Sequence, residues 1–181
     1  MSEALYLEDI DVGSSWKSPA RTVTESDIVS FAGMTGDFDP LHVDHEFAAE
    51  TPYGKPIAHG LLGMSFMAGL SSNHPRMRTL AFVRIDDWQF LKPIFVGDTI
   101  HVITSVASIS PKGRRSGEVI WDRSLVNQKG ETVQAGKIVT LVSAESFLPR
   151  TRKTVPEPAS ARLEKLRKVA AEKIDAMADN T

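Results

Sequence analysis

The stretch HGLLGMSFMAGLSS, residues 59–72, decides the fold that the sequence predicts. It is apolar almost all the way round, whereas a helix on a protein surface keeps one polar face. It is too short to span a bilayer, so we expect a helix buried in a protein core. Its small residues, Gly60, Gly63, Ala68 and Gly69, allow other backbone to come close.

Downstream of this helix the pattern changes to that of β-strands. Four segments are rich in β-branched and aromatic residues, and the turn sequences FVGD, PKGRR and QKGE separate them. They cover residues 79–94, 97–110, 116–128 and 131–144. Three consecutive long strands joined by short turns form an antiparallel meander. The sequence therefore predicts an α+β domain over residues 1–147, in which an antiparallel sheet wraps around one long central helix.

Upstream of the central helix, residues 1–23 predict an extended arm and the next residues predict a helix. Thr24 is a suitable N-cap, and Asp27 three residues later approaches a capping box. Gly36 is a natural end for this helix. The segment DHEFAAE then predicts a short second helix, which a loop rich in proline and glycine ends.

The C-terminal part of the chain differs in composition from the rest. Residues 148–160 are proline-rich and basic, which is typical of a linker. Residues 161–181 carry apolar side chains at spacings of three and four, which predicts an amphipathic helix. We expect this C-terminal helical extension to dock on its own domain or on a partner subunit.

Composition excludes several classes of function. The 181 residues carry a formal net charge of −2, which gives no electrostatic basis for binding nucleic acid. The chain has no cysteine, so disulfides and thiolate chemistry are excluded. Its N-terminus is acidic where a signal peptide is basic, and no apolar stretch reaches about 18 residues. The expected location is therefore the cytoplasm.

The segment TGDFDPLHVDH, residues 35–45, gathers three acids and two histidines. One interpretation is a solvated turn, but the apolar residues Leu41, Val43 and Phe47 favour a segment held against a core. A calcium loop of the EF-hand type is excluded, because His42 and Ala48 stand where it needs glycine and glutamate. The histidine spacing matches no standard zinc signature either.

The remaining interpretation is an acid–base pair. Pro40 breaks regular structure between Asp37 and His42, so a bend there can point both side chains into one pocket. A carboxylate and an imidazole that face one water can hold it and take its proton. Histidine suits this task because its pKa ordinarily lies near neutrality.

Three ordered segments of the chain resemble one known family. TGDFDPLH resembles the hydratase 2 motif of the MaoC-like dehydratases, also called (R)-specific enoyl-CoA hydratases, which runs Gly-Asp-x-Asn-Pro-aliphatic-His with a small residue six positions later, here Ala48. KPIAHGLLGMSFMAGL resembles the segment that leads into the family's central helix, and FLKPIFVGDTI resembles its turn between strands. The resemblance covers roughly residues 20–145 and implies the hot-dog fold.

This resemblance implies an activity and a set of site residues. The activity is hydration of trans-2-enoyl-CoA to (3R)-hydroxyacyl-CoA, or the reverse dehydration, without a cofactor and with the CoA thioester as substrate. Asp37 and His42 would activate water, and the backbone N–H of Gly60 would bind the thioester oxygen. His59, in the family's His-Gly pair, would have a supporting role. A helix N-terminus suits a developing oxyanion because its N–H groups are free.

Asp39 departs from the family, which usually has asparagine at this position. An ionised aspartate only accepts hydrogen bonds, whereas asparagine also donates them. Asp39 would also add a second negative charge beside Asp37. We expect this charge to shift the pH optimum or the substrate range.

Other interpretations stay open beside the hydratase. Ser65 can hydrogen-bond in the pocket or to its own helix. A serine hydrolase of the nucleophile-elbow type is excluded because the chain has no Gly-x-Ser-x-Gly motif. The alternatives that remain are a hot-dog acyl-CoA thioesterase and a non-catalytic acyl-CoA-binding subunit. A single sheet leaves one edge open, so a homodimer or a larger homo-oligomer is expected, with no nucleic-acid or membrane partner.

Overall fold

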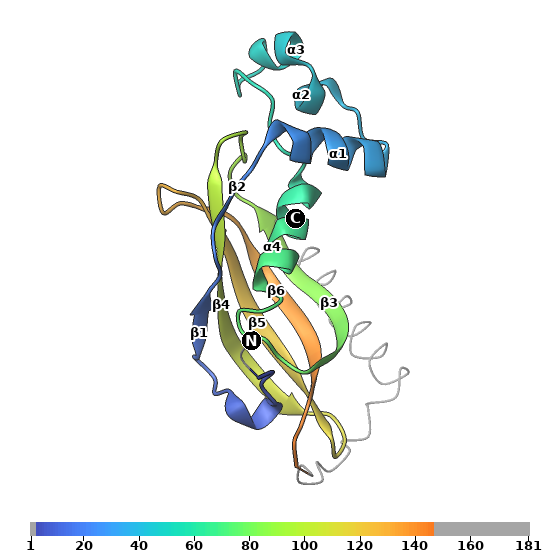
Figure 1. Cartoon of the computed structure of the whole chain (residues 1–181), viewed down its shortest axis with the longest axis vertical. Helices are drawn as coiled ribbons and strands as arrows, with labels where there is room; N and C mark the ends of the chain where they lie inside the picture. The colour runs from blue at the N-terminus through green and yellow to red at the C-terminus, as the bar shows by residue number, and fades with distance from the viewer. Residues whose placement is uncertain (1–2, 147–181) are drawn as a thin grey trace, which may run out of the picture. The chain divides into compact units, whose positions relative to one another are not determined.

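A computed structural model of the chain describes residues 3–146. The predicted linker at 148–160 and the predicted C-terminal helix at 161–181 lie outside these residues. The central helix is α4 (Gly60–Ser71), within one residue at each end of the stretch that predicted it. A curved antiparallel sheet lies behind this helix and wraps around it (Figure 1).

The main sheet has four long strands. They are β3 (Thr79–Phe90), β4 (Thr99–Pro111), β5 (Ser116–Val126) and β6 (Thr132–Ser143). The order across the sheet is β1-β4-β5-β6-β3, so β4, β5 and β6 form the predicted meander. β3 pairs with β6 rather than with its sequence neighbour β4, from Thr79 opposite Val142 to Phe90 opposite Gln134. β3 is therefore an edge strand among the described residues.

The N-terminal arm follows the other edge of the sheet. After a 3-10 turn, η1 (Leu7–Asp9), it forms two short strands, β1 (Ser15–Lys17) and β2 (Arg21–Thr22). Both pair antiparallel with β4. The extended arm that the sequence predicts is present, and the turn at η1 was not foreseen.

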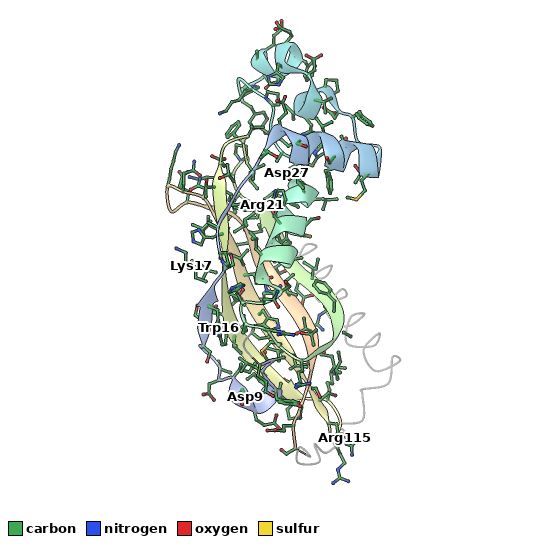
Figure 2. All side chains as sticks on the ribbon, viewed as in Figure 1. Asp9, Trp16, Lys17, Arg21, Asp27 and Arg115 are labelled. Carbon is green, nitrogen blue, oxygen red and sulfur yellow. The ribbon has the colours of Figure 1, made fainter. Side chains whose placement is uncertain are left out.

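Helix α1 (Glu25–Thr35) begins and ends where its sequence signals indicate. The Thr24 hydroxyl accepts from the Asp27 N–H, and the Asp27 carboxylate accepts from the Thr24 N–H at 2.8 Å, which completes a capping box. Asp27 also pairs with Arg21 at 2.7 Å (Figure 2). Gly36 ends the helix with φ of 82°, a left-handed conformation that suits glycine.

Two short helices follow and lead the chain toward α4. The sequence predicted only the second, α3 (His45–Ala49), which Asp44 caps. The first, α2 (Pro40–Val43), begins at Pro40, and the Asp39 side chain caps it by accepting from the Leu41 N–H at 2.9 Å. Proline is well suited to a first helical position because its missing N–H would have no partner there. Pro40 therefore starts a helix.

The core lies between the concave face of the sheet and one face of α4. Trp121 of β5 is its largest fully buried side chain, and the Trp121 Nε1–H donates to Thr140 Oγ1 at 2.8 Å. On α4 the buried residues are Leu62, Gly63, Met67 and Ser71. These features confirm the α+β hot-dog domain that the sequence predicts.

One expectation about α4 was wrong. The sequence predicted burial on all sides, but Leu61 is 59% exposed and Ser65 and Ala68 are exposed too. A single sheet can cover only one side of a helix, so the opposite apolar face stays uncovered by residues 3–146. No helix in this range is long and apolar enough to cross a membrane.

Candidate active site

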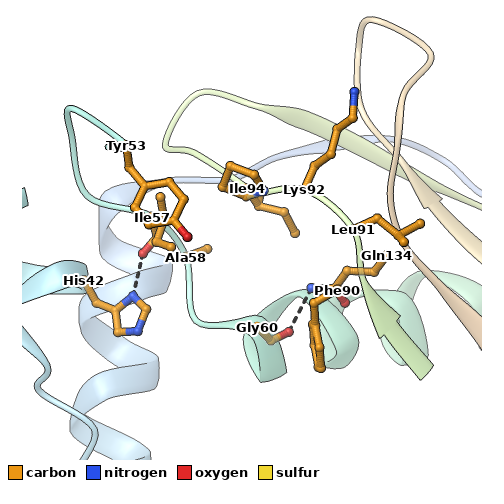
Figure 3. A pocket seen from close by; sticks show the side chains of 11 residues that line it. His42, Tyr53, Ile57, Ala58, Gly60, Phe90, Leu91, Lys92, Ile94 and Gln134 are labelled. Carbon is orange, nitrogen blue, oxygen red and sulfur yellow. Dashed lines mark hydrogen bonds between the residues drawn. The ribbon is translucent and has the colours of Figure 1, made fainter. Parts of the chain in front are cut away.

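A pocket of about 240 Å³ lies at the N-terminal end of α4. Figure 3 shows it between the His42 side chain of α2, the loop that carries Tyr53 and Ile57, and the segment that follows β3. Gly60 of α4 and Gln134 of β6 lie at its inner side. The pocket thus joins the segments that the sequence singled out for chemistry.

His42 is fixed by its backbone contact. Its Nδ1 lies 2.7 Å from the carbonyl oxygen of Ile57 (Figure 3). A carbonyl oxygen only accepts hydrogen bonds, so Nδ1 carries the proton of the neutral ring. Nε2 then holds the lone pair. This contact gives His42 the tautomer of a general base, with its basic nitrogen free to meet a substrate or a water.

His59 lies directly behind His42. The ring centroids of His42 and His59 are 3.8 Å apart at an interplanar angle of 31°. The Phe31 ring also packs against His59, with 5.1 Å between the ring centroids. The His59 ring is buried, and its Nε2 donates to the backbone oxygen of Asp37 at 2.9 Å. His59 therefore holds the position of both Asp37 and His42, which is a supporting geometry.

Asp37 directly follows Gly36, whose left-handed conformation ends α1. Its carboxylate is half exposed and lies 4.0 Å from His59 Nε2. One oxygen of Asp37 and one ring nitrogen each of His42 and His59 all lie within 4.8 Å of one another. At this spacing the carboxylate and an imidazole can share one hydrogen-bonded water.

Gly60 is the first residue of α4, where backbone N–H groups have no partner within the helix. Its carbonyl accepts from Gln134 Nε2 at 2.9 Å, which ties the first turn to β6 (Figure 3). A Cβ at position 60 would lie 3.0 Å from a Phe90 ring carbon, so glycine allows Phe90 to pack at the helix end. Glycine therefore keeps the helix N-terminus accessible beside the Phe90 ring.

Of the predicted residues, His42 and Gly60 line the pocket itself. Asp37 and His59 lie next to His42 without lining it, and Asp39 and Ser65 belong to neither group. Asp39 is exposed and uses its carboxylate to cap α2. The Ser65 hydroxyl donates to the Leu61 carbonyl at 2.8 Å within α4, which satisfies it locally. The structure thus brings Asp37, His42, His59 and Gly60 together, and leaves Asp39 and Ser65 outside.

Several lining residues were not foreseen as site residues. Gln134 is a buried polar side chain, but its strand also holds threonines and a lysine, so no sequence signal marks it. Tyr53 and Phe90 have no such signal either. Lys92 also lines the pocket, with its Nζ 2.6 Å from Glu131 Oε1.

The Asp37, His42 and His59 donors are of the kinds that bind zinc, but their arrangement disfavours a shared ion. A metal binds an imidazole nitrogen at about 2.0–2.1 Å along its lone pair, which lies in the ring plane. Stacked rings hold their lone pairs in neighbouring planes, so one ion cannot meet both lone pairs well. The arrangement suits a water between acid and base better.

Comparison with known proteins identifies the chain's relatives. Residues 11–127 match the family model of the MaoC like domain. The chain belongs to the MaoC-like dehydratase family. The MaoC-like region therefore includes the Asp37–His42 motif, the N-terminal end of α4 and the first strands of the meander.

Several MaoC-like relatives show which activities occur in this family. The chain is 38% identical over 115 residues to 3-hydroxybutyryl-CoA dehydratase of Methylorubrum extorquens, covering 62% of this chain and 70% of that one. It is 30% identical over 139 residues to the (R)-specific enoyl-CoA hydratase of Rhodospirillum rubrum, covering 77% and 92%. It spans only 34% of Protein MaoC of Klebsiella aerogenes, at 35% identity over 113 residues.

A solved MaoC-like structure supports the fold. The crystal structure of the MaoC-like dehydratase from Rhodospirillum rubrum superposes with a TM-score of 0.72 at 27% identity. The match covers 81% of this chain and all of that one. The hydratase and dehydratase character of the family agrees with the motif in residues 35–45.

Proposed function

We propose that this chain hydrates trans-2-enoyl-CoA thioesters to (3R)-hydroxyacyl-CoA, or catalyses the reverse dehydration. One observation carries the proposal: the Asp37 carboxylate lies within 4.8 Å of a ring nitrogen of His42, and His42 lines one pocket with Gly60, the first residue of α4. An acid–base pair and an oxyanion site are the two elements that addition of water to an enoyl thioester needs.

The proposed reaction places each atom as follows. The thioester oxygen accepts from the Gly60 N–H, which draws electron density away from C3. The water oxygen adds to C3, and its proton passes to the Asp37–His42 pair. The resulting enolate takes a proton at C2 from that pair, so the site returns to its starting protonation state. The positive end of the α4 dipole favours the enolate oxygen during this step.

Substitution of the pair tests the proposal. Asp37→Asn and His42→Ala remove the carboxylate and the base, and each should lower kcat for crotonyl-CoA hydration by roughly 10²–10⁴-fold. Loss of enoyl absorbance measures the rate. His45→Ala is the matched control, since His45 is exposed and pairs with Glu25 at 2.7 Å. Unchanged activity in both site variants would contradict the assignment.

The same assay separates hydration from hydrolysis. A thioesterase directs water to the thioester carbonyl and releases free CoA thiol, which a thiol reagent detects. Hydration consumes the double bond and releases no thiol. Hydrolysis also removes the enoyl-thioester absorbance, so the thiol decides: thiol release in step with the loss of absorbance would replace the hydratase assignment with the thioesterase. Binding of acyl-CoA without either reaction would indicate a non-catalytic subunit.

We also propose that two copies of this chain assemble through β3. This edge strand is twelve residues long and exposes Leu80, Phe82, Val83 and Ile85. A long apolar edge with unpaired backbone groups is a template for another strand. Antiparallel pairing of two β3 edges would satisfy those groups and continue one sheet into the next.

A further inference from the structure

Arg123 is a charged residue on the core side of β5. Its neighbours in the same row of the strand, Trp121 and Leu125, are 1% and 0% exposed. The Arg123 Nε is itself buried and has no hydrogen-bond partner among residues 3–146. Arginine is seldom placed this way unless a partner for its charge exists.

No carboxylate within the described residues meets this guanidinium. Its recorded contacts are the weak acceptor Met67 Sδ, 3.8 Å from Nη1, and the Trp121 ring, 6.0 Å from Cζ. Burial lowers the pKa of Arg123 to about 10, and no neighbouring acid offsets this. Arg123 therefore stays charged near neutral pH without a counter-charge.

Arg123 lines a second pocket, of about 260 Å³. It is the only charged residue among those described that line this pocket, whose walls include the apolar Ala68, Met77 and Phe82. The hydroxyl-bearing residues Ser71 and Thr140 also line it. A mostly apolar cavity with one fixed cation suits a ligand with an aliphatic stem and an anionic end.

The two pockets lie along the same pair of elements. The first is lined by Gly60 of α4 and Phe90 of β3, and the second by Ala68 and Phe82 of the same elements. Ala68 follows Gly60 by eight residues, about 12 Å along a helix axis. An extended aliphatic chain gains about 1.2 Å in length with each carbon–carbon bond. A chain of about six to eight carbons, with one hydrogen bond at each end, therefore spans this distance.

We propose that the acyl group of the substrate ends in a carboxylate, which Arg123 binds. The inference rests on the proposed function, because it takes the thioester to lie at Gly60. The acyl chain then follows α4 from the first pocket to the second, and its carboxylate supplies the counter-charge that Arg123 lacks. The guanidinium offers a planar fork that fits a carboxylate through two hydrogen bonds. The substrate class is therefore an enoyl-CoA derived from a dicarboxylic acid.

Binding of saturated thioesters tests this without any turnover. Calorimetry compares adipoyl-CoA with hexanoyl-CoA and suberoyl-CoA with octanoyl-CoA, pairs that differ only in the terminal carboxylate. The dicarboxylic member of at least one pair should bind roughly tenfold to hundredfold more tightly. Arg123→Met, which keeps the volume and removes the charge, should abolish this difference. Lys137→Met is the control, because it removes an exposed cation next to Gly136, the residue that pairs with Arg123.

Turnover of the matched unsaturated substrates gives the second measurement. The ratio of kcat/KM for 2-hexenedioyl-CoA over 2-hexenoyl-CoA should exceed one and should fall tenfold or more in Arg123→Met. A protein that binds adipoyl-CoA selectively but hydrates neither substrate would refute the proposed function and keep this inference. If the protein hydrates 2-hexenoyl-CoA but binds both members of each calorimetric pair equally, the proposed function stands and this inference is refuted.

Two other results would also overturn the inference. If Arg123→Met weakens both members of a pair equally and lowers the free energy of unfolding, the arginine has a structural role. If the substitution instead shifts the dimer toward monomer in light scattering, a carboxylate of the second copy occupies the site.

Discussion

Asp39 has a local role that does not depend on its charge. Its Oδ1 accepts from the Leu41 N–H and so caps α2, the helix that carries His42. An asparagine side chain carries the same acceptor oxygen in the same place. The aspartate that departs from the family motif therefore preserves the position of His42.

The Asp39 interpretation predicts two different outcomes at one position. Asp39→Asn should keep kcat/KM for crotonyl-CoA within about threefold, as for a substitution that keeps its contacts. Asp39→Ala removes the acceptor and should lower the free energy of unfolding by about 1 kcal/mol. Urea denaturation and the hydration assay measure both effects. A change above tenfold in Asp39→Asn would instead give the Asp39 charge a part in catalysis.

The stacked rings of His42 and His59 predict that activity needs no metal. Ring centroids 3.8 Å apart at an interplanar angle of 31° disfavour one ion on both lone pairs, so we expect no tightly held ion at Asp37. Dialysis against EDTA should leave the hydration rate unchanged, and added Zn²⁺ should not raise it. A rate that EDTA abolishes and Zn²⁺ restores would assign the cluster to a metal.

At the scale of elements, the capping box of α1 links stability to pH. Burial acts to raise the pKa of Asp27, but hydrogen bonds from Thr24 and Arg21 outweigh it, so the folded protein holds this pKa below its ordinary value. The carboxylate therefore stabilises the fold above the ordinary aspartate pKa of 3.8, and this contribution is lost as the pH falls through the lower, folded value.

Asp27→Asn measures this contribution. The variant should lose about 1 kcal/mol of unfolding free energy at neutral pH, since it weakens a helix cap. The difference from the unsubstituted protein should shrink as the pH falls below the ordinary aspartate pKa. Urea titrations at several pH values follow it, with Asp11→Asn as an exposed control. A difference that stays constant across this range would rule out the linkage.

The sequence predicts some of these elements better than others, because some depend on neighbouring residues and others on contacts between distant segments. Thr24, Asp27 and Gly36 act within a few residues, so the bounds of α1 follow from local chemistry. A proline such as Pro40 can either interrupt regular structure or occupy the first position of a helix. The Asp39 side chain, which caps α2, shows that Pro40 does the second. The pairing of β3 with β6 and the Gln134 contact with Gly60 join distant segments, which no local pattern specifies. The motif named Asp37, His42 and Gly60, but not the walls of their pocket.

At the scale of the whole molecule, the edge of β3, which residues 3–146 leave uncovered, predicts a dimer that charge can disrupt. Two copies related by a twofold axis place like residues near each other at such an edge. Val83→Glu combined with Ile85→Glu should therefore convert the dimer to a monomer, because like charges repel and apolar burial is lost. Light scattering measures the mass. Val12→Glu changes an equally apolar residue, 64% exposed, outside the main sheet and should leave the dimer intact. A dimer that survives both β3 substitutions would use another surface.

The strand order also sets a sequence of events during synthesis. β3 is the first of the four long strands to leave the ribosome, yet its partner β6 is the last. Thr79 of β3 pairs with Val142 of β6, so β3 gains its partner strand only when nearly all of the described chain has emerged. We expect the meander of β4, β5 and β6 to close first, because its contacts are local. An apolar strand that stays exposed for that interval can aggregate with other chains. The charged residues Arg84, Asp86 and Asp87 interrupt the apolar sequence of β3 and so oppose this aggregation.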